Sequence, residues 1–325
     1  MKAAITGSLV VSALLCGLSA GVARADALTP IRFVYDWAGA DHELIPLVVG
    51  QEKGFYQQAG LDVKVIFPPD SQTTARMLAL GQADVGLNAT TDVVFAADQG
   101  LPVIAVGLYS QHNNWGLFTR PGVPISLKDL KGKSIAIYTD SWSKAMLPFV
   151  LKAAGLQEND VRLIIAQDDD VPLLLSGKVD IATNTSNFLI PSVELAQSKT
   201  PGALIGKQAG VPDVPVWAYT ASTRYLQEHP DTAKKWMQAT IKATEWAAAH
   251  PQQAAEMLHT AYPDSGSVAL STRAWQIIAP DMKGPQGYMM QNDDNWLPIA
   301  RALKATGQIN SVLPANKYYT NQLVK

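Results

Sequence analysis

The chain has 325 residues, of which 47% are apolar and 17% are charged, and its formal net charge is −2. This composition is typical of globular proteins, and the length allows two domains of ordinary size. The near balance of charge provides no basic surface for a phosphate backbone, so a nucleic acid is not an expected partner. Cys16 is the only cysteine, which excludes a disulfide framework and a zinc site built from cysteines.

The N-terminus has the pattern of a secretory signal peptide. Lys2 supplies a positive start, residues 9–18 form a short apolar run, and residues 23–25 (Ala-Arg-Ala) have the small residues of a cleavage site. The run is too short to favour a membrane span, and no later segment is long and apolar enough for one. We therefore expect residues 1–25 to be removed from a protein that is exported across one membrane.

The first part of the mature sequence alternates strand-like and helix-like segments. Apolar, β-prone runs are followed by helical stretches that end at a glycine, as at Gly60 and Gly81. This alternation favours a parallel α/β sheet. In chain order we expect a strand at 31–35, a helix at 43–58, a strand at 63–67, a helix at 71–80, and strands at 85–87 and 103–108.

The same alternation then restarts. The Gly-x-x-Asp unit of residues 81–84 recurs at residues 177–180, and an apolar strand-like run follows each copy. This internal similarity predicts two lobes of the same α/β type. The expected elements are a strand at 134–138, a helix at 143–154, a strand at 161–165, a helix at 168–176 and a strand at 179–183.

The C-terminal third is mostly helical in pattern. Apolar residues recur at a spacing of three or four over residues 233–248, which is typical of an amphipathic helix. Pro230 and Pro251 suit first helical positions, and a further helix is expected at 296–305. Because these helices have no strands of their own to cover, we expect them to pack on the first lobe.

This arrangement requires the chain to leave the first lobe, build the second and return. Two extended segments, 115–120 and 215–220, are suited to the crossings. The predicted domains after the signal peptide are therefore a discontinuous first lobe, 26–117 with 218–325, and a second lobe, 118–217.

No familiar catalytic motif is present. The sequence has no G-x-S-x-G elbow, no phosphate-binding P-loop and no H-E-x-x-H motif. None of the five histidines pairs with another at metal-ligand spacing on one helix face. We therefore expect no catalytic residue, no bound metal and no cofactor.

Ligands of open α/β sheets bind beyond the carboxyl ends of the strands. That rule selects loops in both lobes that carry aromatic and hydrogen-bonding side chains, which together suit a small planar polar molecule. The predicted ligand-binding residues are Asp36, Trp37, His42, Asn88, Thr90, Trp115, Asp140, Ser141, Trp142, Asn184 and Trp217.

Structural roles are open alternatives for these residues. Trp37 would either stack on a ligand or pack, and Asp36 would either accept a hydrogen bond from a ligand amine or cap the next helix. Asparagines also serve turns without any ligand. Trp115 and Trp217 lie on the expected crossings, where packing at a hinge is the alternative. The loop 140–142 precedes a helix, whose free N–H groups could receive an anion instead.

Several motifs resemble a known family. Residues 51–56 (QEKGFY) and 60–63 (GLDV) are similar to the opening of the ABC-importer substrate-binding proteins for sulfonates, nitrate and thiamine precursors. Residues 80–86 (LGQADVG), 97–103 (ADQGLPV) and 127–134 (LKDLKGKS) continue the resemblance in the expected order. It implies a periplasmic binding protein fold of type II, with two lobes that are each a sheet flanked by helices and are joined by two extended hinge crossings.

Asp36-Trp37, with His42 shortly after, resembles the pyrimidine-precursor branch of that family, which includes hydroxymethylpyrimidine-type importers and eukaryotic pyrimidine synthases. The resemblance implies a ligand ring stacked on Trp37, with nearby carboxylate and amide groups that hydrogen-bond to its amino and ring nitrogens. The usual asparagine between the tryptophan and the histidine is absent, since residues 38–41 read AGAD. The synthases use a cysteine-rich segment, which the mature chain lacks.

The expected function is that of a non-enzymatic periplasmic receptor. The lobes would close over a nitrogen heteroaromatic such as an aminopyrimidine, and the closed form would dock on an ABC permease with its ATPase. The resemblance also implies a monomer. An alternative ligand is a sulfonate or an aromatic carboxylate, for which Arg76 and Arg120 are the candidate partners. Alternatives of other classes are a pyrimidine-synthase-like enzyme or exported hydrolase, and a sensor that signals through a membrane receptor.

Overall fold

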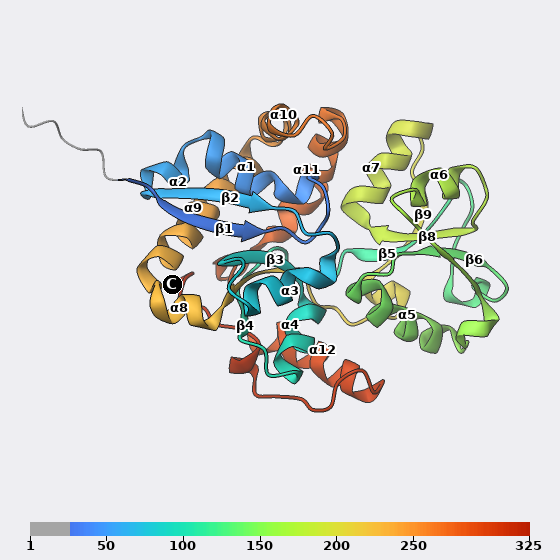
Figure 1. Ribbon diagram of the computed structural model, residues 1–325. Helices are drawn as coiled ribbons and strands as arrows, with labels where there is room; N and C mark the ends of the chain where they lie inside the picture. Colours follow the sequence, from blue (N-terminus) through green and yellow to red (C-terminus); the bar gives the residue numbers. More distant parts are fainter. Residues whose placement is uncertain (1–26) are drawn as a thin grey trace, which may run out of the picture.

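The structure is a computed structural model that describes residues 27–325. It holds two five-stranded sheets, each flanked by helices, which form two lobes lying side by side (Figure 1). The predicted signal peptide, residues 1–25, lies outside the described residues. Within the described part of the chain, no helix combines the length and the apolar character that crossing a membrane requires.

The first sheet is built from β1 (Thr29–Val34), β2 (Leu61–Ile66), β3 (Val85–Ala89), β4 (Val103–Leu108) and β10 (Trp217–Ser222). Its strand order is β2-β1-β3-β10-β4. β1 pairs in parallel with β2 and β3, whereas β10 runs antiparallel between β3 and β4. The returning chain therefore completes the sheet that its N-terminal part began.

The second sheet repeats this arrangement with β5 (Trp115–Thr119), β6 (Ser134–Ile137), β7 (Arg162–Ile165), β8 (Ile181–Thr185) and β9 (Gly202–Ile205). Its order is β7-β6-β8-β5-β9. β6 pairs in parallel with β7 and β8, and β5 is the antiparallel strand, here between β8 and β9. The two lobes thus share one topology, in agreement with the internal similarity of the sequence.

The repeated Gly-x-x-Asp unit has the same structural role in both lobes. Asp84 accepts a hydrogen bond from the backbone N–H of Arg32 at 2.8 Å, and Asp180 accepts one from the backbone N–H of Ser134 at 2.9 Å. Gly81 and Gly177 begin the two units with φ values of 70° and 75°, a conformation that favours glycine. Each unit therefore ties the strand that follows it, β3 or β8, to its parallel neighbour, which is β1 in the first lobe and β6 in the second.

Helices cover both faces of the first sheet (Figure 1). Phe33 of β1 packs with helices on one face, and the next residue, Val34, packs with helices on the other. Because both faces are covered, β4 is buried along its whole length and its sequence is a continuous apolar run. The helices of this part are α1 (Ile45–Glu52), α2 (Phe55–Gln58), α3 (Ser71–Ala79), α4 (Thr90–Asp98), α8 (Thr223–Glu228), α9 (Pro230–Ala249), α10 (Pro251–Ala261), α11 (Val268–Met282) and α12 (Asp293–Ala305).

The second sheet is flanked by α5 (Ser141–Ala154), α6 (Asp170–Leu175) and α7 (Ser186–Gln197). Leu117 of β5 packs in the cluster that contains α5, and Phe118 packs in the cluster that contains α6 and α7. Short elements complete the chain. They are the 3-10 helices η1 (His42–Leu44), η2 (Leu127–Asp129), η3 (Glu158–Asp160), η4 (Gly206–Ala209) and η5 (Ala315–Lys317), and the hairpin of β11 (Lys283–Gly284) and β12 (Gly287–Tyr288).

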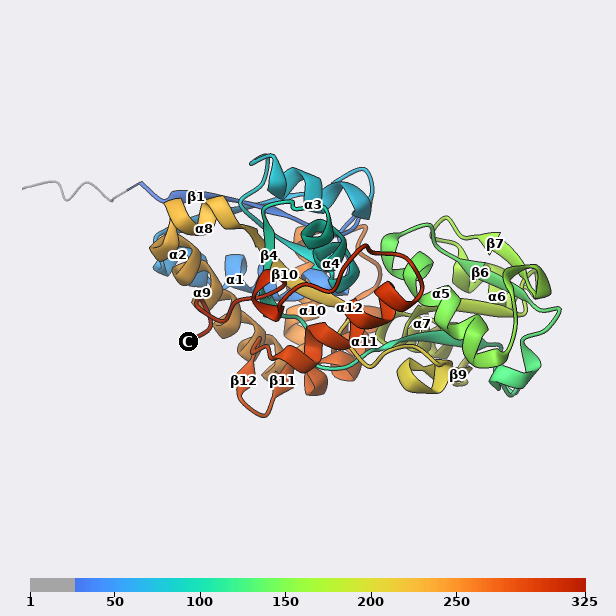
Figure 2. The ribbon, with the colours of Figure 1, turned by 90° about the horizontal axis from the view of Figure 1, so that it is seen from below.

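The C-terminal helices pack largely as expected. Trp236 of α9 is fully buried against the first sheet, with its ring centroid 6.2 Å from that of Phe33 and 6.0 Å from that of Tyr219. α12 lies apart from α9, near α4 and α5 (Figure 2). Gln308, which follows α12 in the sequence, donates a hydrogen bond from its side chain to the carbonyl oxygen of Ala145 in α5. The C-terminal part therefore contacts both lobes.

Two expectations about local structure differ from what is observed. The helix expected at 43–58 is two helices, α1 and α2, because Gly54 between them has a left-handed backbone with φ 68°. The expected crossings are strands: β5 pairs with both of its neighbours in the second sheet, and β10 does so in the first. The chain crosses just before each strand, at 109–114 and 206–216, and the exact lobe boundaries stay a prediction.

The first crossing is held to α11 by Asp281. Its Oδ2 accepts hydrogen bonds from the backbone N–H groups of Gln111 and His112, at 3.1 and 3.0 Å, and its Oδ1 contacts the Nδ1 of His112. The hydrogen bond to Asp281 raises the pKa of His112 above its ordinary value. The hinge segment is therefore tied to the first lobe by a pair whose charge depends on pH.

This pair predicts a small loss of stability at alkaline pH. The pKa of His112 is raised in the folded state, so its contribution is complete below the unfolded value of about 6.5 and is lost as the pH rises through the folded value. The His112 side chain is 66% exposed, and solvent screening limits the effect to under about 1 kcal/mol. We expect urea denaturation to give a larger wild-type advantage over His112→Asn at about pH 5.5 than at about pH 8.5. A constant difference between the two proteins would contradict the linkage.

Candidate functional site

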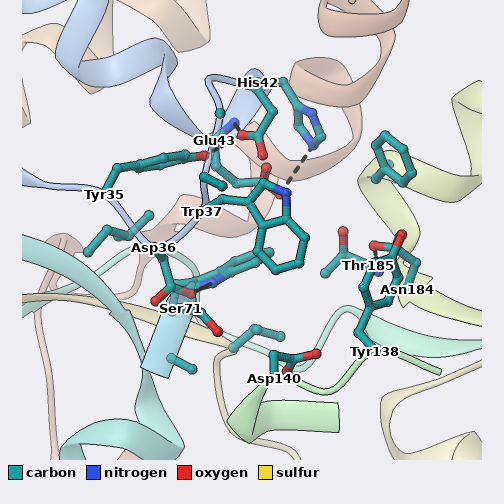
Figure 3. A pocket seen from close by; sticks show the side chains of 18 of the residues that line it. Tyr35, Asp36, Trp37, His42, Glu43, Ser71, Tyr138, Asp140, Asn184 and Thr185 are labelled. Atoms are coloured by element: carbon teal, nitrogen blue, oxygen red, sulfur yellow. Dashed lines mark hydrogen bonds and ion pairs between the residues drawn. The ribbon is translucent and has the colours of Figure 1, made fainter. Parts of the chain in front are cut away.

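A cavity of about 570 Å³ lies between the two lobes. The first lobe contributes the loop 35–43 that follows β1, and the second contributes 138–143 after β6 and the end of β8. These are carboxyl ends of parallel strands, where ligands of such sheets bind. The volume is in the usual range for small-molecule sites, about 300–1,000 Å³. Figure 3 shows side chains from both lobes, among them Trp37 and Tyr138, meeting in this space.

Most of the predicted site residues line the cavity. They come from both lobes and from both strands that follow the crossings, so the fold brings together positions that are far apart in the sequence. The predicted residues that line it are Asp36, Trp37, His42, Trp115, Asp140, Ser141, Trp142, Asn184 and Trp217.

Asn88 and Thr90 are the exceptions, and the structure corrects their expected placement. Both side chains are fully buried inside the first lobe. Asn88 Oδ1 accepts a hydrogen bond from the Thr220 hydroxyl at 2.6 Å, and the Thr90 hydroxyl donates to the carbonyl oxygen of Pro215 at 2.7 Å. The strand-end rule identified the correct loop, but these two side chains hold the returning chain and do not line the cavity.

Asp36 has a free hydrogen-bonding atom in the cavity wall. Its Oδ2 accepts a hydrogen bond from Trp217 Nε1 at 2.9 Å, whereas its Oδ1 is buried and has no partner within residues 27–325. Burial and the negative charge of nearby Asp92 raise the pKa of Asp36 well above its ordinary value. Asp41, not Asp36, caps the following helix, since Asp41 Oδ1 accepts from the backbone N–H of Glu43 at 3.0 Å. The helix-capping alternative for Asp36 is therefore excluded.

Trp37 and Tyr138 bring the two lobes into contact in the cavity. Their ring centroids are 5.7 Å apart with an interplanar angle of 75°. Trp37 is half-buried, so part of its indole surface stays open to the cavity. The Tyr138 hydroxyl donates to Asp170 Oδ1 at 2.9 Å, which holds this ring in place from behind. Aromatic surface from both lobes is thus available to a ligand.

A buried polar network also joins the lobes beside the cavity. Asn187 of α7 donates to Glu43 Oε1 at 3.1 Å, and its Nδ2 lies 2.8 Å from His42 Nε2. Its Oδ1 accepts from the Asn114 side chain at 2.6 Å. Burial disfavours the charged form of Glu43, but the adjacent His42 outweighs it and lowers the pKa of Glu43 to about 2. Asn187 therefore ties an ion pair of the first lobe to the second.

Asp41, His42 and Glu43 are also close enough together to hold a metal ion, since their ligand atoms lie within 4.8 Å of one another. Those atoms already have protein partners. Asp41 Oδ1 accepts from the Tyr35 hydroxyl, and Glu43 contacts both His42 and Asn187. Hydrogen bonds within the protein therefore satisfy this cluster without an ion.

The cavity wall is acidic. Among the described residues that line it, His42 is the only basic one, and there is no lysine or arginine. Six acidic residues line the cavity. Asp36 and Glu43 are buried, Asp41 and Asp140 are half-buried, and Asp168 and Asp264 are exposed.

Arg76 and Arg120, the candidate partners for an anionic ligand, do not reach the cavity. Arg76 is exposed on α3. Arg120 donates from Nη1 to the carbonyl oxygens of Leu174 and Val179, at 3.3 and 3.1 Å, and so stabilises the second lobe. Both lie outside the cavity lining, which leaves an anion without a strong counter-charge there.

Some lining residues were missed from the sequence. Tyr138 could have been found from the sequence, because it directly follows β6 as Tyr35 directly follows β1. Phe188 lies just after the selected end of β8, and its ring stacks on that of His42 at 6.1 Å. The segment 264–270, which includes the start of α11, could not be found from the sequence, because it lies in a region that was expected only to cover the first lobe.

Comparison with known sequences identifies relatives named for thiamine metabolism. The sequence profile of the family described as NMT1/THI5 like matches residues 41–254. A Haemophilus influenzae protein named for thiamine biosynthesis is 29% identical over 257 residues, which cover 77% of this chain and 79% of the relative. A 4-amino-5-hydroxymethyl-2-methylpyrimidine phosphate synthase of Candida albicans is 23% identical over 237 residues, covering 69% of each chain.

Solved structures identify the fold. The periplasmic aliphatic sulphonate binding protein SsuA of Escherichia coli matches with a TM-score of 0.69 at 14% identity, covering 90% of this chain and 92% of that one. The periplasmic nitrate-binding protein NrtA of Synechocystis PCC 6803 matches with a TM-score of 0.64 at 14% identity, covering 91% and 87%. The predicted two-lobed periplasmic binding protein fold is confirmed, and the chain belongs to the NMT1/THI5-like family.

Proposed function

We propose that the protein is the solute-binding receptor of an ABC importer and that its lobes close over a small nitrogen heteroaromatic, such as an aminopyrimidine precursor of thiamine. The observation that carries this proposal is the free Oδ1 of Asp36, a buried acceptor in a ligand-sized cavity. A buried carboxylate oxygen without a partner is costly, and a ring amine of a ligand would satisfy it.

A second free atom supports the same class of ligand. The Nε1 of Trp142 is a buried donor without a partner, and Trp142 also lines the cavity. An aminopyrimidine carries an amine, which donates, next to a ring nitrogen, which accepts, so it complements a free acceptor and a free donor. The aromatic rings of Trp37 and Tyr138 would cover the ring itself.

Transport follows from the way the two lobes enclose the site. Ligand contacts made by both lobes favour the closed form, and that form would dock on a membrane permease whose ATPase drives import. One chain supplies both walls, so we expect the receptor to act as a monomer. It would do so in the periplasm, after removal of residues 1–25.

An anionic ligand is less compatible with the wall. A sulfonate or an aromatic carboxylate usually requires an arginine or lysine, and the lining residues that the structure describes include neither. The fungal relatives named as synthases raise the alternative of an enzyme. The chain after Cys16 has no cysteine, and we propose that it binds its ligand without converting it. Steady formation of a product by the purified protein would contradict this.

A thermal-shift screen of the purified protein tests the proposal. The panel would contain aminopyrimidines, thiamine, alkyl sulfonates and aromatic carboxylates. A ligand present at about 100 times its dissociation constant adds about 2.7 kcal/mol to the free energy of unfolding. We expect such a shift with aminopyrimidines, and mass spectrometry should recover the ligand unchanged. A shift with sulfonates or carboxylates alone would overturn the proposed ligand and keep the receptor role.

A further inference from the structure

We propose that this cavity selects its ligand by positive charge, so that it takes a heteroaromatic ring carrying a cationic group and rejects the phosphate ester of the same ring. The inference rests on the proposed function, and it names the chemical class of ligand for that site.

The charges of the wall are almost all of one sign. Two of its carboxylates, Asp36 and Glu43, are more than nine-tenths buried. Its one basic side chain, His42, lies 3.2 Å from Glu43 Oε1 and is therefore occupied by that carboxylate. Asp140 is half-buried at the start of α5, where its Oδ1 accepts from the backbone N–H of Ser143 at 2.7 Å. A bound molecule would therefore meet negative potential from both lobes.

Asp36 is the carboxylate that a cation would reach. Asp36 is 8% exposed, and its Oδ1 has no partner in the part of the chain that the structure describes, where its side chain accepts one hydrogen bond, from the neutral indole of Trp217. The described lining residues include no arginine or lysine to compensate a charge on Asp36, and Asp92 and Asp140 are acidic neighbours. Burial and Asp92 raise the pKa of Asp36 and so disfavour its ionised form in the empty cavity. A ligand cation would supply both the missing hydrogen-bond donor and the counter-charge that favours ionisation. A neutral hydroxyl group would supply only the donor.

The aromatic rings of the cavity also favour a cationic ligand. Trp37 and Tyr138 present ring surface from the two lobes, and Trp217 lies beside the free carboxylate oxygen. The face of an aromatic ring attracts cations, most strongly when water is excluded. A phosphate group would instead bring up to two negative charges into a wall of carboxylates. Like charges placed together at a recognition site cost several kcal/mol, which separates the ester from the cation.

A matched series of ligands tests the proposal. The probes are 4-amino-2-methylpyrimidines that carry an aminomethyl, a hydroxymethyl or a phosphooxymethyl group at C5. Isothermal titration calorimetry at neutral pH would measure all three against the purified protein. We expect the ammonium-bearing ring to bind about 10-fold or more tighter than the alcohol, as charge-assisted hydrogen bonds are about twice as strong as neutral ones. The phosphate ester should bind about 100-fold or more weaker than the alcohol.

Asp36→Asn removes the charge and keeps the shape of the side chain. In this variant we expect the preference for the ammonium over the alcohol to fall to near one. Asp62→Asn is the matched control and should leave the preference unchanged, because Asp62 lies on β2 outside the cavity lining, with a side chain that is 44% exposed and 3.4 Å from the Lys64 ammonium. Wild-type protein at rising ionic strength gives a test that needs no variant, since affinity for the ammonium should fall while affinity for the alcohol stays constant.

The outcomes separate this inference from the function on which it rests. If the ammonium and the alcohol bind wild-type protein equally, or if the phosphate ester binds as tightly as the alcohol, charge selection is overturned and the receptor for heteroaromatic rings remains. If Asp36→Asn keeps the full preference, Asp36 is not its source. If none of the three rings binds, the proposed function fails, and this inference fails with it.

Discussion

Trp37→Ala is expected to weaken binding of an aromatic ligand by about 10- to 100-fold and to leave the free energy of unfolding of the empty protein nearly unchanged. Stacking of a ring on an aromatic side chain is worth about 1–3 kcal/mol. Trp37 is half-buried in the loop after β1 and contacts Tyr138 of the other lobe only by an edge arrangement. Truncation therefore removes cavity wall and little core. Calorimetry with an aminopyrimidine would measure the loss.

Trp246→Ala is the matched control for this prediction. Trp246 is also half-buried, and it lies on α9, where its ring stacks on His250 with centroids 4.4 Å apart. It is not among the residues that line the cavity. Its loss should leave affinity unchanged, and Trp37→Phe should retain most of the binding. Affinity at the wild-type level in Trp37→Ala would show that this tryptophan serves packing alone.

Asn187→Ala is expected to weaken binding by about 30- to 150-fold by disfavouring the closed form. The Asn187 amide is fully buried and contacts Glu43, His42 and Asn114, so it joins the second lobe to the first and to the crossing before β5. Its removal leaves the buried Asn114 amide without its partner and takes one donor from Glu43, which keeps His42, and leaving a buried polar group unpaired costs about 1–3 kcal/mol. Because affinity depends on the fraction of closed protein, the cost appears in the dissociation constant.

The control for Asn187 is an exposed contact between the same lobes. Arg273 of α11 and Glu194 of α7 form an ion pair at 3.2 Å, with side chains 48% and 25% exposed. Surface pairs of this kind contribute under about 1 kcal/mol. Arg273→Ala should therefore change affinity by less than about 5-fold. Small-angle scattering with and without ligand would report closure. Equal losses of affinity in Asn187→Ala and Arg273→Ala would mean that burial does not determine how strongly a contact between the lobes stabilises the closed form.

Local sequence rules were enough to place much of the candidate site. Asp36-Trp37 directly follows a strand, and the loop 140–142 precedes a helix, so the strand-end rule reached both. The same rule misplaced Asn88, because the position of a residue along a strand does not show which neighbouring residue its side chain will hydrogen-bond. Thr220, 132 residues later, returns in β10 and occupies Asn88 Oδ1.

The sequence by itself determined the alternation of strands and helices, the repeated unit that ends in Asp84 and Asp180, and the loops that carry the aromatic residues. These features depend on local periodicity and turn chemistry, which residues close together in the sequence determine. The tertiary structure alone decided that Asp36 keeps a free oxygen, because its partner Trp217 is 181 residues away. It also decided that Asn187 joins the lobes and that 264–270 reaches the cavity. Periodicity encodes which side of an element is buried, whereas contacts between distant segments arise only when the lobes pack.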